Sequence, residues 1–438
     1  MLYTVALLLF PIMFLPLVGT ATEYGNLGMS DYVLPFIYLA LLPGLPAAIG
    51  RQGFPRRVTI CFVLFVAWAL ASTLTIPLRF QVSDTTDYYV GFGLLKLGKF
   101  AEYAVFGYFL LPWLKDQRSI NWFKLALLGG TLAMALNATW ISMYVAEADV
   151  AEEGKQAILG GKNGVSTLLA MLVAYWAADL LYTKRNLLAM AGILGVVLLA
   201  LAGMLICMGR GGWVAAIVAV SYLLFTVRKR PRFAARLAAF MIAMAVLTAV
   251  VITRSPAIQD RIDETLHADE HSSGQEGINP FTEVTGLDDG GRVTLFLYGL
   301  MMMSDCPVLG SGFFHRGDNT GVFIAGMHNF FTEMGLETGL VGLTLLLIIL
   351  VSFWRQIGRG WPHREGNLSA RIALRAAIVA VTTACFSEEY LYGGLHLLCL
   401  SAFAALTVAE NRLLLRPREQ ELVIAGDLLA GPYMVRGT

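Results

Sequence analysis

Apolar and polar positions along this chain alternate in long blocks rather than at the spacing of a single amphipathic helix or strand. Apolar runs of roughly 17 to 25 residues, the length that crosses a bilayer as a helix, follow one another from end to end. Polar segments separate them. The pattern predicts an all-α polytopic membrane protein with about twelve transmembrane helices. The runs lie near residues 3–20, 31–49, 57–77, 93–114, 121–143, 163–182, 187–207, 212–227, 233–253, 329–354, 371–387 and 391–410.

The composition agrees with this pattern. Of the 438 residues, 57% are hydrophobic and 14% are charged, against about 45–50% and about 25% in soluble globular proteins. These fractions exclude a soluble enzyme, a disordered chain and a secreted disulfide scaffold. The formal net charge is +1, so the chain lacks the basic excess of a nucleic-acid-binding protein.

The loops between the runs alternate in charge, which predicts their orientation. One set is basic and includes the cluster Arg228-Lys229-Arg230-Pro231-Arg232 and the tail with Arg412, Arg416 and Arg418. The other set is acidic or mixed. Because cytoplasmic loops carry the excess of Lys and Arg, we expect both termini in the cytoplasm.

One connection is much longer than the others. Residues 254–327 lie on the predicted outer face, where connections of this length are usually functional or disordered. An apolar run, Val293 to Met303, indicates a short helix inside this loop. We therefore expect four parts: helices 1–9 over 1–253, a large outer loop over 254–327, helices 10–12 over 328–410, and a cytoplasmic tail over 411–438.

The strongest candidate site lies where the long loop meets the tenth run. His328 and Asn329 open that run, and Glu333 and Glu337 follow on one face of the same helix. Ionisable residues at membrane depth are functional by default. The alternative is an interfacial histidine above two carboxylates that favour a helix N-terminus.

Arginines provide two further candidates on the outer side. Arg210 stands among glycines between two apolar runs, where its planar guanidinium could bind phosphate in a bidentate manner. A snorkelling arginine beside a tight turn is the alternative. Arg292 precedes the apolar run of the long loop, whose helix N-terminus could hold an anion. A solvated loop arginine is the alternative there.

Two lysines form a weaker candidate in the outer half of the fourth run. Lys96 and Lys99 could receive a phosphate. Lys99 could instead pair with Glu102 or Tyr103 at helical spacing, which would be a purely structural role. The sequence leaves both interpretations open.

Three motifs together resemble the O-antigen ligase and polymerase superfamily of bacterial envelope glycosyltransferases. They occur in the family's order, over roughly residues 160–355. The motifs are Gly209-Arg210-Gly211-Gly212, Arg292 followed by Pro307-x-x-Gly310-x-Gly312, and His328-Asn329 followed by Glu337-x-Gly339-x-x-Gly342. One departure is that Gly211 follows Arg210, where small hydroxyl residues are also common in the family.

The resemblance implies a C-type membrane glycosyltransferase of the bacterial inner membrane. Such an enzyme passes a glycan from undecaprenyl diphosphate to an acceptor hydroxyl of a glycan, a lipid A-core or a protein, at the periplasmic face, with neither a metal nor another cofactor. Arg210 and Arg292 would bind the diphosphate and His328 would lie near the acceptor, as a base or as an orienting group. Direct displacement would invert the anomeric carbon. The wider set of expected substrate contacts is Arg210, Arg292, Lys99, Lys96, Asn329 and Glu337.

Two other classes of function compete with this one. A transporter or flippase of lipid-linked glycan should carry charges near mid-membrane and repeat its two halves, and the sequence displays neither feature. A non-catalytic subunit with a docking loop would not need His328 beside two arginines. Within the leading class, the sequence does not distinguish a ligase, a chain polymerase and a protein O-glycosylating transferase.

Overall fold

The computed structural model is a helical bundle, and the α-helical class expected from the sequence is confirmed. The residues that it describes are 2–14, 21–22, 25–26, 29–44, 54, 56–79, 86–145, 161–183, 185–207, 209–228, 233–254, 259, 292–313, 329–358, 365–386 and 395–429. Within these ranges the only strands are β1 (Ala21–Thr22) and β2 (Gly25–Asn26), which form a small antiparallel hairpin.

Each of the twelve predicted runs coincides with a helix. In chain order the helices are α1 (Leu2–Leu9), η1 (Phe10–Phe14), α2 (Met29–Leu41), η2 (Leu42–Gly44), α4 (Arg56–Leu74), α5 (Ile76–Arg79), α6 (Thr86–Leu110), η3 (Leu111–Trp113), α7 (Gln117–Val145), α9 (Gly161–Tyr182), α10 (Leu187–Ile206), α11 (Arg210–Arg228), α12 (Ala234–Arg254), α16 (Arg292–Asp305), α17 (Phe330–Gly358), α18 (Glu365–Cys385) and α19 (Leu395–Leu429).

Eight of the described helices are long and apolar enough to cross a membrane. They are α4, α7, α9, α10, α11, α12, α17 and α18. The helices over Leu2–Phe14 and Ser30–Gly44 are apolar but shorter. The number of twelve spans and the orientation of the termini therefore stay predictions.

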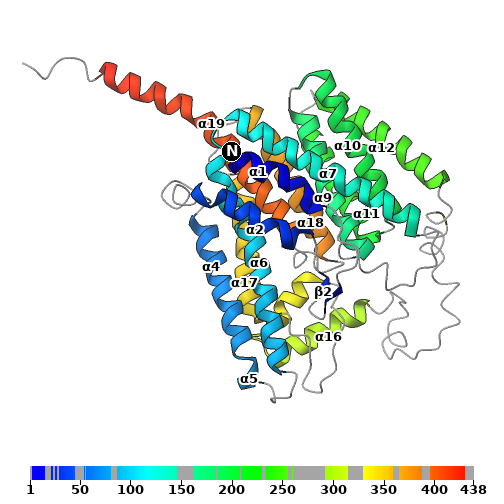
Figure 1. Cartoon of the computed structure of the whole chain (residues 1–438), viewed down its shortest axis with the longest axis vertical. Helices are drawn as coiled ribbons and strands as arrows, with labels where there is room; N and C mark the ends of the chain where they lie inside the picture. Colours follow the sequence, from blue (N-terminus) through cyan, green and yellow to red (C-terminus); the bar gives the residue numbers. More distant parts are fainter. Residues whose placement is uncertain are drawn as a thin grey trace, which may run out of the picture.

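Helix α9 is the centre of one half of the bundle. It is buried along its whole apolar length, with α18, α10 and α11 packed against it (Figure 1). Two of its aromatic residues join it to neighbouring helices. Tyr175 stacks on Phe403 of α19, with ring centroids 3.9 Å apart, and Trp176 Nε1 donates to Thr131 Oγ1 of α7 at 3.0 Å. A helix that is apolar on every face over most of its length is stable in this place because protein surrounds it on every side.

A second group of helices packs beside this one. Helix α4 lies against α17, and α6 lies against α19, whose C-terminal part runs out of the bundle (Figure 1). The α6–α19 contact is close because Gly107 has no side chain: its N–H donates to Ser401 Oγ at 2.7 Å. A Cβ there would lie 2.5 Å from Ser401 O.

Buried ions connect the two groups at the end of the bundle that carries the basic loops. Lys124 of α7 contacts Asp179 of α9 at 3.1 Å and Glu410 of α19 at 2.6 Å. Arg185, just after α9, contacts the other oxygen of Asp179 at 2.7 Å. Two positive and two negative groups thus balance one another. Removing one member of such a buried pair costs about 3–5 kcal/mol, because it leaves an uncompensated charge.

Candidate functional site

Helix α17 is broken near its start, at Gly339. This glycine has φ 67° and ψ −178°, a backbone conformation that residues with a Cβ rarely adopt. The break frees carbonyls of the preceding turn. A loop between α16 and α17 fills this gap: Ser311 N–H donates to Leu336 O at 2.7 Å, and Gly312 N–H donates to Glu337 O at 2.9 Å.

Helix α4 closes the same break from the other side. Trp68 Nε1 donates to Thr338 O at 2.9 Å, and Ser72 Oγ lies 3.0 Å from Glu337 O. Thr73 Oγ1 accepts from the N–H of Phe313, the last described residue of this loop, at 3.1 Å. Nothing in the sequence pattern pointed to these α4 residues, because their partners lie far away along the chain.

Two of the three sequence motifs therefore meet in one joint. Pro307 O accepts from Leu340 N–H at 2.7 Å. A Cβ on Gly310 would lie 2.4 Å from the backbone of Glu337, and one on Gly339 would lie 2.0 Å from Val308 O. Gly310 and Gly339, one from each motif, thus allow two backbones to approach each other. We name this contact between the 307–313 loop and the break of α17 the glycine joint.

The start of α17 is fixed by Asn329. Its side-chain Oδ1 accepts from the N–H groups of Phe331 and Thr332, each at 3.1 Å, in the manner of an N-cap. Its Nδ2 donates to Phe386 O, just beyond the end of α18, at 3.3 Å. Asn329 was expected among the substrate contacts, and the structure gives it a role in holding this end of α17. His328 immediately precedes it in the sequence and lies outside the described residues.

Asn329→Ala is expected to destabilise the protein by about 1 kcal/mol, the usual cost of removing an N-cap side chain. Asn329→Asp keeps the acceptor oxygen and should retain most of this stability. The measurement is the melting temperature of the two variants in detergent. Equal melting temperatures for Asn329→Ala and the wild type would contradict a capping role.

The two carboxylates of the first part of α17 are buried. Glu333 and Glu337 both have an exposed fraction of 0%. The sequence offered Glu337 as a substrate contact or as a group near the helix start. The structure places it beside the glycine joint, in the packed interior.

Arg210 is the first residue of α11, and its side chain is exposed. The glycines beside it pack against α9: a Cβ on Gly209 would lie 2.6 Å from Ser166 Cβ, and one on Gly212 would lie 2.1 Å from Ser166 Oγ. Ser166 Oγ also donates to Gly209 O at 3.2 Å. These two glycines therefore let α11 begin against α9, and the guanidinium of Arg210 extends from that anchored start.

Neighbouring contacts place Arg210 and Asn329 at the same end of the bundle. Thr167, the next residue of α9, lies 3.0 Å from Nε2 of the buried His396 near the start of α19. The starts of α9, α11 and α19 thus meet there. The start of α18 meets the end of α9, where Ser369 Oγ lies 2.7 Å from Thr183 Oγ1. Helix α18 packs along α9 and α11 from there, so its end lies beside the starts of these two helices. Asn329 contacts that end through Phe386.

Arg292 is the first residue of α16, and its side chain lies outside the described part of the structure. The apolar run predicted inside the long loop is this helix. It packs against α17, and a Cβ on Gly335 would lie 2.5 Å from Met303 Sδ. Small residues in the first part of α17 thus allow α16 to lie close to it.

The lysine pair makes different contacts from those that spacing alone suggested. Lys99 Nζ contacts Asp31 of α2 at 2.8 Å. Tyr103 OH donates to Ser30 Oγ at 3.1 Å and approaches the same Asp31 carboxylate at 3.3 Å. Lys96 Nζ lies 5.0 Å from the ring centroid of Phe92. Asp31, which sequence reasoning did not connect with α6, therefore organises this group.

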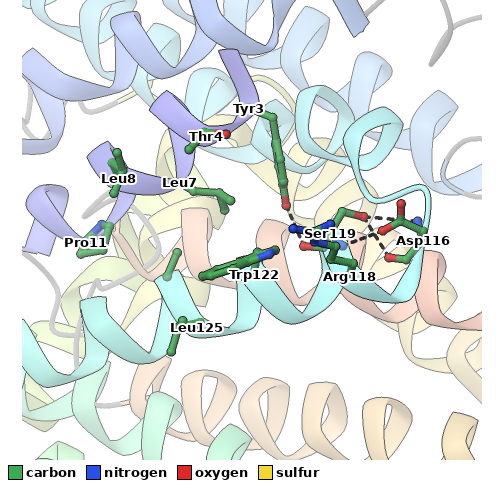
Figure 2. Close-up of a pocket in the computed structure, with 11 residues that line it drawn as sticks. Tyr3, Thr4, Leu7, Leu8, Pro11, Asp116, Arg118, Ser119, Trp122 and Leu125 are labelled. Atoms are coloured by element: carbon green, nitrogen blue, oxygen red, sulfur yellow. Dashed lines mark hydrogen bonds between the residues drawn. The ribbon is translucent and has the colours of Figure 1, made fainter. Parts of the chain in front are cut away.

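A separate cavity of about 670 Å³ lies between α1, η1 and α7 (Figure 2). Tyr3 crosses it and donates from its OH to Ser119 O at 2.8 Å. Its rim carries Asp116, whose pKa is held below the usual range mainly by the backbone N–H of Ser119. Arg118 lies beside that carboxylate. This cavity is at the end of α7 that follows a basic loop, so it does not belong to the candidate site.

Comparison with known proteins agrees with the motifs. Residues 195–347 match the family model described as O-Antigen ligase. The matched segment runs from α10 to the middle of α17, and it includes Arg210, Arg292, His328, Asn329 and the glycine joint. No curated protein matches the chain. Among the described residues, no group of three or more His, Cys, Asp and Glu is placed to hold a metal ion.

Proposed function

Since the chain carries an O-antigen ligase domain over residues 195–347, in agreement with the resemblance to the O-antigen ligase and polymerase superfamily, we propose that it transfers a glycan from undecaprenyl diphosphate to an acceptor hydroxyl. The family indicates a ligase or polymerase type of membrane glycosyltransferase, and the chain is a multi-pass membrane protein. Beyond this family-level activity, we propose the undecaprenyl diphosphate carrier, a location in the inner membrane and a reaction at the periplasmic face of that membrane. The observation that carries it is the domain match over the segment that holds Arg210, Arg292 and His328.

The proposed reaction is a single displacement at the anomeric carbon. The acceptor oxygen forms a bond to that carbon while the bond to the carrier diphosphate breaks. The electron pair goes to the diphosphate oxygen, and the acceptor proton goes to His328. The products are the glycosylated acceptor, with inverted anomeric configuration, and undecaprenyl diphosphate. A histidine suits this task because its ordinary pKa, about 6.5, lies near ambient pH.

Arg210 and Arg292 are assigned to the leaving diphosphate, where negative charge develops in the transition state. A fixed donor at such a position contributes about 2.7–4 kcal/mol. The anchored start of α11 supports the assignment of Arg210, because its backbone is held against Ser166 while its side chain is exposed. Arg292 opens α16, which packs on α17.

The glycine joint supports the same proposal through positioning. Transfer requires donor and acceptor groups to be held at the reacting distance, and errors of about 1 Å can cost about 100-fold in rate. The joint fixes the first part of α17 against α4 and the 307–313 loop. Asn329, the N-cap residue of α17, belongs to that fixed segment.

The test is the size of lipid-linked glycans in a deletion strain, compared with the same strain carrying the wild-type gene. Loss of the protein is expected to enlarge the undecaprenyl-linked pool, because the carrier is no longer unloaded. Single repeat units on the carrier would identify a polymerase, and long chains would identify a ligase. An unchanged pool on the periplasmic side would contradict the proposal. Accumulation confined to the cytoplasmic leaflet would instead favour the flippase alternative.

A further inference from the structure

A second cavity lies at the opposite end of the bundle from the candidate site. Its volume is about 400 Å³, and it lies between α11, α17 and α18. Its lining residues are Tyr222, Phe225, Thr226, Trp354, Leu368, Arg371, Ile372 and Arg375. Sixteen positions of α11 separate Arg210 from Thr226, which is about 24 Å along the helix axis. The two places are therefore close to a membrane thickness apart.

This cavity opens at the end of the bundle that carries basic loops. Helix α11 ends at Arg228, and the sequence continues as Lys229-Arg230-Pro231-Arg232. On α17, Arg355 directly follows the lining residue Trp354 and is exposed. The positive-inside rule assigns such an end to the cytoplasm. A negatively charged ligand would therefore be drawn to this end before any specific contact forms.

Two arginines give the cavity its charge. Arg371 and Arg375 are four positions apart on α18, so both lie on the same helix face. The eight lining residues include these two cations and no carboxylate. Planar guanidinium groups in this arrangement are typical of sites for phosphate, which they bind with two parallel hydrogen bonds.

Aromatic side chains hold one of these cations in place. The guanidinium of Arg375 lies over the ring of Trp354, 4.9 Å from its centroid, and its Nη2 donates to Trp354 O at 3.4 Å. Tyr222 packs against the same tryptophan, with ring centroids 6.0 Å apart. Among the described residues, the buried Nε of Arg375 has no hydrogen-bond partner. Stacking on Trp354 thus fixes the guanidinium of Arg375 in the wall of the cavity.

The surface next to the cavity is apolar and exposed. Phe225, itself a lining residue, is 56% exposed. On α17, Ile348 and Val351 precede Trp354 by one to two turns and are also exposed. Trp and Tyr mark the membrane–water interface in helical membrane proteins. An occupant with a phosphate in the cavity would therefore find hydrocarbon contacts directly beside it, on the membrane side.

We infer that this cavity binds the phosphate headgroup of an anionic phospholipid, with Arg371 and Arg375 on the phosphate and the acyl chains along α11 and α17. Basic pockets between transmembrane helices at the cytoplasmic side bind such headgroups. The lipid would join α11, α17 and α18 at one end. Helices α11 and α17 carry Arg210 and Asn329 at their other ends. Lipid binding in the cavity would therefore stabilise the helices that present the candidate site.

The experiment uses the purified full-length protein in detergent, titrated with phosphatidylglycerol or with phosphatidylcholine of the same chains. The readouts are the melting temperature and the number of lipids retained in native mass spectrometry. We expect phosphatidylglycerol, and not phosphatidylcholine, to raise the melting temperature of the wild type. Arg371→Gln with Arg375→Gln should weaken this binding about 30-fold, which corresponds to about 1 kcal/mol for each arginine.

The matched control removes the same charge elsewhere. Arg56 and Arg57 begin α4, are exposed, and follow another basic loop. Arg56→Gln with Arg57→Gln should leave phosphatidylglycerol binding unchanged. An equal loss in both double variants would reduce the effect to general charge attraction and overturn the inference, as would equal binding of the two lipids by the wild type.

Two further measurements test whether the phosphate comes from a lipid or from solution, and allow for a double variant that does not fold. If millimolar inorganic phosphate raised the melting temperature by itself and displaced phosphatidylglycerol, the cavity would be a site for a free anion, and the lipid assignment would be wrong. Should the double variant not fold, Arg371→Gln alone takes its place, since Arg375 carries the stacking contact with Trp354. Undiminished lipid binding by a folded Arg371→Gln would equally contradict the inference.

Discussion

A strain that carries His328→Ala in place of the wild-type gene is expected to lose about 10²–10⁴-fold in glycan transfer, the usual contribution of a positioned general base. The protein should stay at its normal level in the membrane, because this substitution leaves the Asn329 cap intact. The measurement is the amount of transferred glycan per unit of protein, together with the undecaprenyl-linked pool, which should enlarge as it does in the deletion strain.

Two further substitutions separate the possible roles of this histidine. His328→Gln keeps a hydrogen-bonding side chain but cannot take up the acceptor proton at ambient pH. If it is as inactive as His328→Ala, proton transfer is the required property; if it restores most activity, the side chain only orients the acceptor. His271→Ala, in the same predicted outer loop, is the control and should be fully active. Normal transfer by His328→Ala would remove His328 from the mechanism.

The helices were predictable from the sequence because each depends on a local property, the length of an apolar run. The run at 163–182 became α9, and the short run at 293–303 became α16. The first run was predicted over 3–20, and its described part, Leu2 to Phe14, consists of α1 and η1. Pro11 interrupts that run, and the helix continues from Phe10 as a tighter 3₁₀ turn.

Contacts between distant helices could not be predicted in this way. The sequence offered Lys99 a partner in its own helix as one of two interpretations, and the contact that it makes in the structure is with Asp31 of α2. The buried ion pairs of Lys124 with Asp179 and Glu410 join three helices. In the sequence, each of these residues is an isolated charge in or beside an apolar run. Which of these charged residues meet depends on how the helices pack, and the pattern within one helix does not predict that.

The motif glycines illustrate a different limit. The small residues around Arg210 suggested access for an anionic group, which stays a prediction, and the structure gives Gly209 and Gly212 a packing role against Ser166. Gly310 and Gly339 entered the sequence analysis only as parts of motifs that resemble a family. Their physical reason, the approach of two backbones, becomes visible only when both segments are placed in space.

Gly339→Ala is expected to destabilise the protein by about 3 kcal/mol or more. Two costs combine: an L-residue in this positive-φ conformation costs about 1–3 kcal/mol, and overpacking a close contact costs about 1–3 kcal/mol. The close contact is explicit, because the new Cβ would lie 2.0 Å from Val308 O. The measurement is the melting temperature in detergent, together with glycan transfer at a temperature at which the variant is folded.

Gly195→Ala is the matched control in the same family segment. Gly195 lies in the middle of α10, and a Cβ there would meet nothing within 4 Å. Since alanine is a better helix former than glycine by about 0.5–1 kcal/mol, this variant should be as stable as the wild type or slightly more stable. Equal melting temperatures for Gly339→Ala and Gly195→Ala would show that the glycine joint is not rigid.

A double substitution tests whether the two motifs act as one unit. Gly310 also has a positive φ, 71°, and a Cβ there would lie 2.4 Å from the backbone of Glu337. Once Gly339→Ala has forced the 307–313 loop away from α17, Gly310→Ala has less contact left to disturb. The two losses of stability should therefore sum to more than the loss in the double variant, as expected for residues in one contact. Simple additivity would mean that the loop and the break of α17 are stabilised independently.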